Sequence, residues 1–264
     1  MELKIGIFDS GIGGFTILNS LLKTRDDVEV FYLADTKRVP YGDKNYDEIR
    51  SIAKEICNWF EDKNLNALLI ACNTTNACAL DIIEGSLKIP CFDLINSVSK
   101  IITKNKIGVL ATPTTVKSSF YKKVIKLKNK NIKVFEQECP EFVPEIEKTQ
   151  LDLNKLNYLS YFYLNPLLKE NIQEIILGCS HYPLIYEVLK NKIHSNIRVI
   201  DPSTSLINKF NNSFPIPKNS CSEGISYKNV NFFVTAKSEE FSKKVKYWLE
   251  INKEIRQVNL RSNA

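Results

Sequence analysis

Two short apolar runs, each ending at a cysteine, constrain this chain more than any other feature of its sequence. Residues 68–71 lead into Cys72, and residues 175–178 lead into Cys179. Apolar runs of this length, bounded by small polar residues, are typical of strands buried in a parallel sheet. Each cysteine then follows the carboxyl end of its strand, where open α/β sheets bind their ligands. We therefore expect the two thiols to face one ligand from opposite sides.

A second pair of similar segments indicates an internal duplication. Residues 4–6 and 106–108 share the sequence Lys-Ile-Gly and lie 102 residues apart, while the two cysteines lie 107 residues apart. These nearly equal offsets predict two tandem, pseudo-symmetric α/β units, each a doubly wound parallel sheet, with the active site between them. We place the first domain at residues 1–95 plus 206–264 and the second at 96–205. Residues 230–234 are expected to form the last strand, in a C-terminal segment that packs back on the first unit.

The composition is that of a cytoplasmic globular protein. The 264 residues are 44% hydrophobic, close to the average for soluble domains. No apolar run approaches the roughly 18 residues of a transmembrane helix, and the first residues lack the layout of a signal peptide. Seven cysteines without CxxC pairs favour free thiols in a reducing compartment.

The net charge of +6 does not by itself indicate a nucleic-acid partner. The densest basic cluster, residues 117–133, has helical spacing, and such runs are usually a solvated face. No alternation of aromatic and basic residues marks a groove for single strands. We expect a small-molecule substrate and neither nucleic acid nor membrane as partner.

The glycine-rich turn at residues 11–14 and the pair Cys179 and His181 suggest two further readings, which we disfavour. In a dinucleotide fingerprint the third glycine would stand where Thr16 stands, and Asp9 would place a carboxylate beside the pyrophosphate. A structural zinc site needs four ligands, and the only other histidine is His194. We predict neither a metal nor a cofactor.

The remaining chemistry is that of the thiols themselves. Inversion of a stereocentre requires removal of a proton from one face of Cα and its return on the other face. Two thiols on opposite sides supply one base and one acid in each direction. A single nucleophile, Cys72 or Cys179 with His181 as its base, would use only one cysteine. Both cysteines could also be buried residues without a chemical role.

Read together, the loop motifs resemble those of glutamate racemases, cofactor-independent isomerases of the aspartate/glutamate racemase family. The likeness extends over essentially the whole chain. The motifs that carry it are residues 9–14 (Asp-Ser-Gly-Ile-Gly-Gly), 40–42 (Pro-Tyr-Gly), 71–74 (Ala-Cys-Asn-Thr), Ala111-Thr112 with Thr115, Cys139-Pro140, and 177–183 (Leu-Gly-Cys-Ser-His-Tyr-Pro). The resemblance implies two racemase-like α/β domains and a homodimer. It also implies conversion of L- to D-glutamate, which supplies peptidoglycan synthesis and so cell-wall biogenesis and cell shape.

The resemblance also implies the roles of individual residues. Cys72 would take the proton from D-glutamate and Cys179 the proton from L-glutamate. Catalysis at the two thiols would be supported by Asp9, His181 and Glu147. The positions that match substrate-binding residues, some of them shared with that group, are Asp9, Ser10, Tyr41, Gly42, Asn73, Thr74, Thr112, Thr115, Ser180 and His181.

Three residues depart from the pattern of glutamate racemases. Thr75 stands where alanine is usual, Ser180 where threonine is usual, and Lys44 where arginine is common. None of them removes a catalytic group, so they bear on affinity and not on reaction type. Other readings stay open: an aspartate racemase or another racemase of the superfamily, a thiol-dependent lyase or hydrolase, or an amino-acid-binding module without catalysis.

Overall fold

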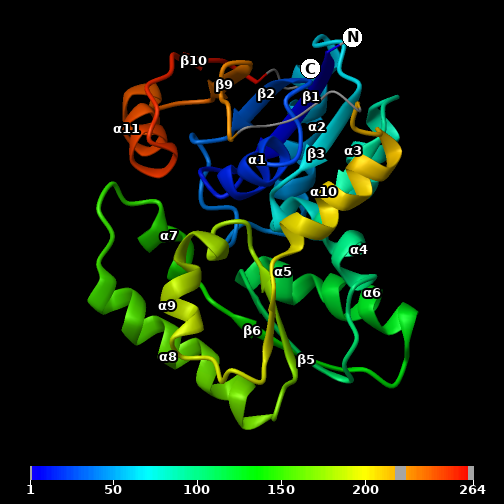
Figure 1. The fold of residues 1–264 in the computed structure, drawn as a ribbon, viewed down its shortest axis with the longest axis vertical. Coiled ribbons are helices and arrows are strands. Elements are labelled where there is room, and N and C mark those ends of the chain that lie inside the picture. Colours follow the sequence, from blue (N-terminus) through cyan, green and yellow to red (C-terminus); the bar gives the residue numbers. More distant parts are fainter. Residues whose placement is uncertain (1, 218–223, 261–264) are drawn as a thin grey trace.

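The computed structural model describes residues 2–217 and 224–260. Its parallel strands form two separate sheets, which lie one above the other in Figure 1. The strands of the first sheet are β1 (Leu3–Asp9), β2 (Val28–Ala34), β3 (Ala67–Ile70), β4 (Cys91–Asp93), β9 (Val230–Val234) and β10 (Ile255–Gln257). Those of the second sheet are β5 (Lys106–Ala111), β6 (Lys133–Glu138), β7 (Glu174–Gly178) and β8 (Arg198–Ile200).

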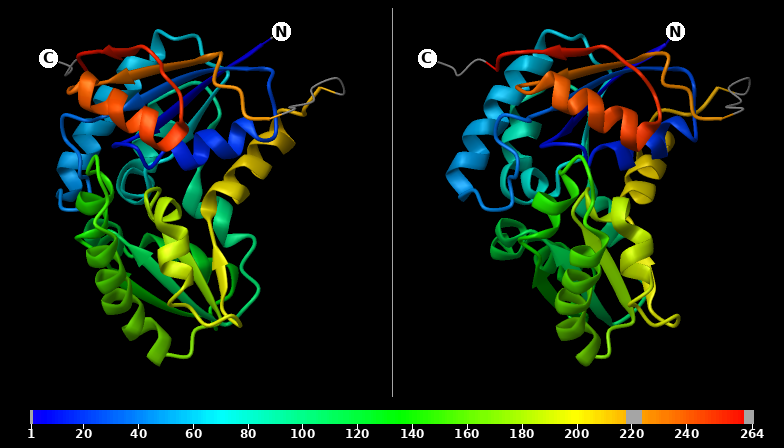
Figure 2. Two further views of the ribbon diagram at one scale, coloured as in Figure 1. Left: turned by 60° about the vertical axis from the view of Figure 1, so that its left-hand side comes forward. Right: turned by 90° about the vertical axis from the view of Figure 1, so that its left-hand side faces the viewer.

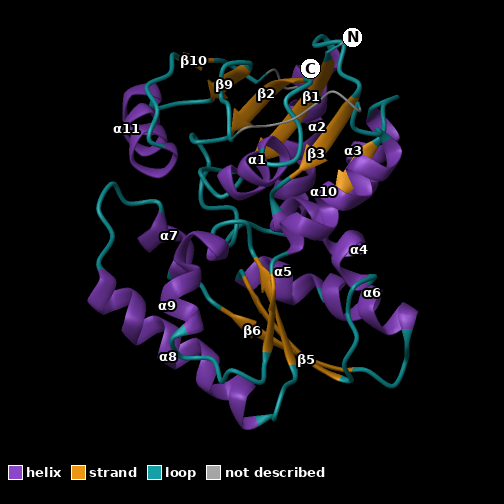
Figure 3. Ribbon diagram, in the orientation of Figure 1, coloured by secondary structure: helices purple, strands orange, loops and turns teal. Residues whose placement is uncertain are grey.

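Helices flank both sheets, as the colouring by secondary structure shows (Figure 3). They are α1 (Phe15–Leu22), α2 (Tyr46–Glu61), α3 (Asn73–Ser86), α4 (Leu94–Ser99), α5 (Pro113–Ser118), α6 (Phe120–Lys128), α7 (Phe142–Ile146), α8 (Leu153–Lys169), α9 (Tyr186–Lys190), α10 (Pro202–Ser213) and α11 (Ser238–Leu249). We call the six-stranded sheet with α1, α2, α3 and α11 the first lobe. The four-stranded sheet with α5 to α9 is the second lobe.

The strand orders reveal the internal duplication. The first sheet runs β10-β9-β2-β1-β3-β4, and the second runs β6-β5-β7-β8. The four strands β2-β1-β3-β4 therefore have the same order as β6-β5-β7-β8, and all neighbours are parallel. Cys72 and Cys179 follow equivalent strands, β3 and β7. The predicted fold class, two parallel-sheet α/β units, is confirmed.

The remaining elements join or extend these units. Strand β9 pairs with β2, so the C-terminal segment extends the first sheet at that edge. Helices α4 and α10 pack against each other and link the lobes, which both views of Figure 2 show as distinct bodies. The predicted domain boundaries, 95/96 and 205/206, fall within these two linking helices, and the division itself stays a prediction.

The buried character of the strands explains why they form a parallel sheet. The last five residues of β1 and all residues of β3 and β7 are buried, as expected where helices cover both faces. Helix α2 begins after Asn45, whose side chain accepts a hydrogen bond of 2.8 Å from the Glu48 amide and so caps the helix. Among the described residues, no helix has both the length and the apolar character needed to cross a membrane.

One local prediction is wrong. Strand β10 follows β9 and pairs with it in parallel, so residues 230–234 are not the last strand. The segment after Thr112 forms two helices, α5 and α6, which Ser119 separates with a left-handed φ of 54°. The six described cysteines are free thiols, as predicted, and Cys221 lies outside the described residues.

Candidate active site

The two thiols line one small cavity between the lobes. The cavity has a volume of about 10 Å³, roughly the space that a single water molecule needs. Both cysteines are buried. The lining residues are Ser10, Tyr41, Gly42, Cys72, Asn73, Thr74, Thr112, Val143, Cys179, Ser180 and His181. The carboxyl ends of strands from both sheets thus meet at one point, as the sequence predicts.

Two polar side chains, His181 and Glu147, form a hydrogen-bonded series next to Cys179. The His181 Nδ1 atom lies 3.7 Å from Cys179 Sγ, and its Nε2 atom lies 2.7 Å from Glu147 Oε1. Burial lowers the pKa of His181, but the hydrogen bonds and charges of Cys179 and Glu147 outweigh burial and raise it well above its usual value. A protonated imidazole donates from both nitrogens, one to the carboxylate and one toward the thiol. His181 is therefore placed to stabilise an anionic sulfur at Cys179.

Asp9 fixes the loops that approach the cavity from the two lobes. Its Oδ1 accepts a hydrogen bond of 2.8 Å from the Gly11 amide, and its Oδ2 accepts one of 2.8 Å from the Ser180 hydroxyl. Burial raises the pKa of Asp9 above its usual value, against the opposing charge of His181. Asp9 thus joins the end of β1 to the loop that carries Cys179.

The surroundings of Cys72 differ from those of Cys179. Cys72 is the residue that precedes α3, and no histidine accompanies it. Burial and the charge of Asp9 raise the pKa of the Cys72 thiol to about 12, although hydrogen bonds from Thr75 act in the opposite direction. The Thr75 hydroxyl is buried and has no other hydrogen-bond partner among the described residues. It is free to donate to the sulfur when the thiolate forms.

We predict that Thr75→Val slows the alkylation of Cys72 by iodoacetamide about tenfold or more, because losing one hydrogen bond to a charged group costs about 1.5 kcal/mol or more. Valine keeps the volume of threonine and leaves the backbone amide in place. Mass spectrometry of the cysteine peptides reads Cys72 and Cys179 in the same sample, so Cys179 is the internal control. Equal rates at Cys72 in both proteins would show that the hydroxyl has no influence on this thiol.

Three threonine hydroxyls also connect the lobes beside the cavity. Thr112 Oγ1 lies 2.9 Å from the hydroxyl oxygens of both Thr74 and Thr115. The Thr114 amide also donates to the Gly42 carbonyl at 2.9 Å. Because Thr74 follows β3 and Thr112 follows β5, these contacts hold the two rims together.

Tyr41 reaches the cavity from a loop that Asp35 anchors. The Asp35 carboxylate accepts hydrogen bonds from the Tyr41 hydroxyl, from Arg38 Nε at 2.6 Å and from the Thr235 hydroxyl at 2.6 Å. Asp35 therefore supports the Tyr41 loop, because its carboxylate binds three side chains of the protein.

Ten of the thirteen predicted site residues line the cavity directly. The other three, Asp9, Thr115 and Glu147, each form a hydrogen bond to a residue that does, namely Ser180, Thr112 and His181. The sequence did not indicate Val143, an apolar lining residue on α7, or Lys244, whose amino group lies 2.8 Å from Glu147 Oε2. Neither residue belongs to a loop motif, so no local signal pointed to it.

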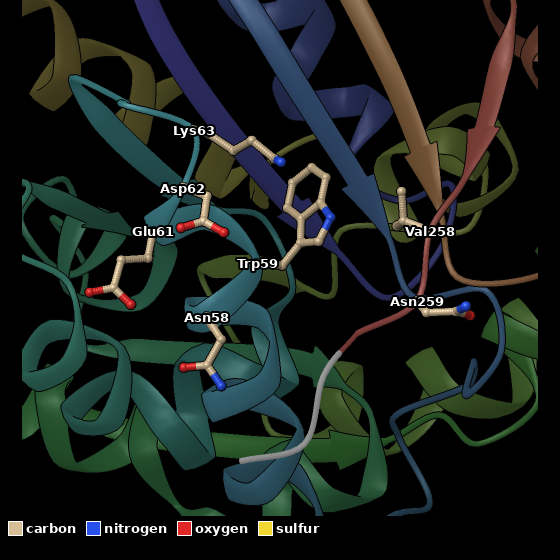
Figure 4. A pocket seen from close by; sticks show the side chains of 7 residues that line it. All are labelled: Asn58, Trp59, Glu61, Asp62, Lys63, Val258 and Asn259. Atoms are coloured by element: carbon tan, nitrogen blue, oxygen red, sulfur yellow. The ribbon is translucent and has the colours of Figure 1, made fainter. Parts of the chain in front are cut away.

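A larger cavity of about 520 Å³ lies elsewhere, against the end of α2 and the segment that follows β10 (Figure 4). Its lining consists of Asn58, Trp59, Glu61, Asp62, Lys63, Val258 and Asn259. None of these residues is a cysteine or a histidine, and none lines the cavity between the thiols. The chemistry indicated by the sequence therefore belongs to the smaller cavity.

Known proteins of similar sequence identify the family. The model of the Asp/Glu/hydantoin racemase family matches residues 16–210. The chain belongs to the aspartate/glutamate racemase family. Within that family, a glutamate racemase of Prochlorococcus marinus (strain NATL1A) is 42% identical over 263 residues, 99% of each chain.

Solved structures of the racemase family show the same fold. Crystal structures of glutamate racemases from Bacillus anthracis and from Francisella tularensis, the latter in complex with D-glutamate, both superpose with a TM-score of 0.87. Their sequence identities to this chain are 27% and 32%, and each comparison covers 99% of both chains.

Proposed function

We propose that this chain is a cofactor-independent glutamate racemase that uses Cys72 and Cys179 as its two acid/base residues. The observation that carries the proposal is the placement of two thiols after equivalent strands of two like sheets, on the wall of one cavity. A site with one base on each face of Cα is what inversion without a cofactor requires. The glutamate racemases of similar sequence and fold support glutamate as the substrate.

The proposed reaction starts when one thiolate takes the Cα proton of glutamate and the other thiol donates a proton to the opposite face. For L-glutamate, Cys179 acts as the base, and the imidazolium of His181 stabilises its thiolate. For D-glutamate, Cys72 acts as the base, and the Thr75 hydroxyl donates a hydrogen bond to its thiolate. The amides at the start of α3 and the hydroxyls of Ser10, Thr74 and Ser180 can hold the substrate carboxylates.

The small volume of the cavity bears on the catalytic cycle. About 10 Å³ leaves no room for an amino acid, so the lobes must move apart to admit glutamate and close around it. Closure excludes water, which strengthens the electrostatic interactions that stabilise a carbanion-like transition state. We further propose that the product supplies peptidoglycan synthesis and that the enzyme acts as a homodimer.

Incubation of the purified protein with L-glutamate in deuterated water, without added cofactor, tests the proposal. Two bases predict that D-glutamate appears with deuterium at Cα while the remaining L-glutamate still carries hydrogen at early times. Chiral chromatography with mass detection separates the four species. Aspartate is the matched substrate, because it is shorter by one methylene. Turnover of aspartate but not of glutamate would show that aspartate is the substrate. Exchange of the Cα hydrogen with neither amino acid would refute the proposal that the protein is a racemase.

A further inference from the structure

Lys244 is a buried cation on a helix whose other lysines are exposed. Its side chain is only 8% exposed, while Lys243 and Lys246 lie on the solvent face of α11. Burial of an ammonium group is costly unless partners compensate its charge. Lys244 has two such partners, Glu147 Oε2 at 2.8 Å and Glu240 Oε1 at 3.1 Å. The Glu240 side chain is 42% exposed and that of Glu147 only 11%, so Glu147 is the partner that draws the amino group inward.

Glu147 is the centre of a hydrogen-bond network that both lobes supply. Its Oε1 accepts from the Ile12 amide at 3.0 Å and from His181 Nε2 at 2.7 Å, while its Oε2 accepts from Lys244. Ile12 and Lys244 belong to the first lobe, whereas Glu147 and His181 belong to the second. With both oxygens engaged, the carboxylate cannot rotate freely, and it holds the His181 ring with Nδ1 toward Cys179.

The charges in this network are consistent with an ionised carboxylate. Burial would raise the pKa of Glu147, but the hydrogen bond and charge of His181, followed by those of Lys244, lower it to about 2.

Helix α11 lies between β9 and β10, outside the four strands that the two units share. Among the described residues, no lysine plays the equivalent part at Cys72. The C-terminal segment therefore supplies a cation only to the hydrogen-bond network that leads to Cys179.

We propose that Lys244 is a positioning residue for the acid/base step at Cys179. It would fix the Glu147 carboxylate, and through it His181, when the two lobes are closed. The inference rests on the proposed function, and it goes further by giving the C-terminal helix a part in the reaction. Lys244 does not line the cavity, so it acts through its neighbours and not on the substrate.

The test compares Lys244→Gln with Lys244→Arg and with the matched control Lys243→Met, an exposed lysine on the same helix. For Lys244→Gln we expect kcat to fall about 10- to 100-fold, as small misplacements of catalytic groups do, with KM within about twofold of wild type. Lys244→Arg keeps the cation and should restore most of kcat. Lys243→Met should match wild type. Thermal unfolding of each protein identifies any variant that is not folded at the assay temperature.

A second readout does not depend on turnover. Alkylation by iodoacetamide at pH 7, followed by mass spectrometry, should slow about tenfold at Cys179 in Lys244→Gln and stay unchanged at Cys72. Unchanged kcat and unchanged alkylation of Cys179 in a folded Lys244→Gln protein would overturn the proposal, as would an equal loss at both thiols or a failure of arginine to rescue. If wild type does not racemise glutamate, the proposed function fails while alkylation still tests the role of Lys244.

Discussion

Cys72→Ala and Cys179→Ala should each lower the rate of glutamate racemisation by about 10²- to 10⁴-fold, the usual contribution of a general acid or base. Each thiol serves one face of Cα, so neither can replace the other. Conversion of L- to D-glutamate, and the reverse, can be followed by circular dichroism. Each variant should retain slow exchange of the Cα hydrogen of one enantiomer only. That enantiomer should be L-glutamate for Cys72→Ala, because Cys179 remains, and D-glutamate for Cys179→Ala.

The matched control is Cys91→Ala. Cys91 is a half-buried free thiol on β4 that does not line the cavity. Its replacement should leave the rate within about twofold of wild type, because it removes only a small hydrophobic group. Loss of activity in only one of the two active-site variants would favour a single nucleophile, and full activity in both would leave the thiols without a chemical role.

Gly13→Ala should lower kcat/KM by about 100-fold or more, because a methyl group at this position occupies the space of the Cys179 loop. A Cβ atom there would lie 2.5 Å from His181 Nδ1 and 2.9 Å from His181 Cε1, and it would also overlap the Ser180 hydroxyl. Gly13 belongs to the first lobe and both neighbours belong to the second. The methyl group therefore either displaces His181 from Cys179 or keeps the lobes apart. Steady-state kinetics with both enantiomers would measure the loss.

Gly85→Ala is the control for this change, since the added methyl group would meet no described atom within 4 Å apart from its chain neighbours and the nearby backbone of its own helix. Gly85 is on α3, where alanine has the higher helix propensity by about 1 kcal/mol. This variant should keep full activity and unfold at an equal or higher temperature. Wild-type kinetics in Gly13→Ala would show that the closed arrangement of the two loops is not needed for catalysis.

The fold and most of the site were predictable from the sequence because their signals are local. Buried parallel strands are apolar over their whole length, and in this fold the polar residues that follow them gather at the facing rims. Cys72 and Cys179 could therefore be placed together, although more than a hundred residues separate them. Strand β10 gave no such signal: it is three residues long, and its sequence Ile-Arg-Gln shows neither an apolar run nor a clear alternation.

Other parts depend on contacts that no local pattern carries. Lys244 lies next to Lys243 and two residues before Lys246, so its segment has the composition of a solvated helix face. Its burial follows from the position of Glu147, 97 residues earlier in the chain. The break at Ser119 likewise has no local signal, since neither a glycine nor a proline stands at this left-handed position. Glu147 itself was indicated only by the resemblance to a family, since its loop has no distinctive composition.

The unlike surroundings of the two thiols have a thermodynamic consequence. L- and D-glutamate are mirror images, so they have equal free energies in water, and the equilibrium ratio of the enantiomers is one. An enzyme with Thr75 beside one sulfur and His181 beside the other cannot change that ratio. It can make kcat and KM different for the two enantiomers, but both must differ by the same factor, so that kcat/KM is equal in the two directions. The asymmetry of the site therefore governs which enantiomer occupies the enzyme longer, and not which one accumulates.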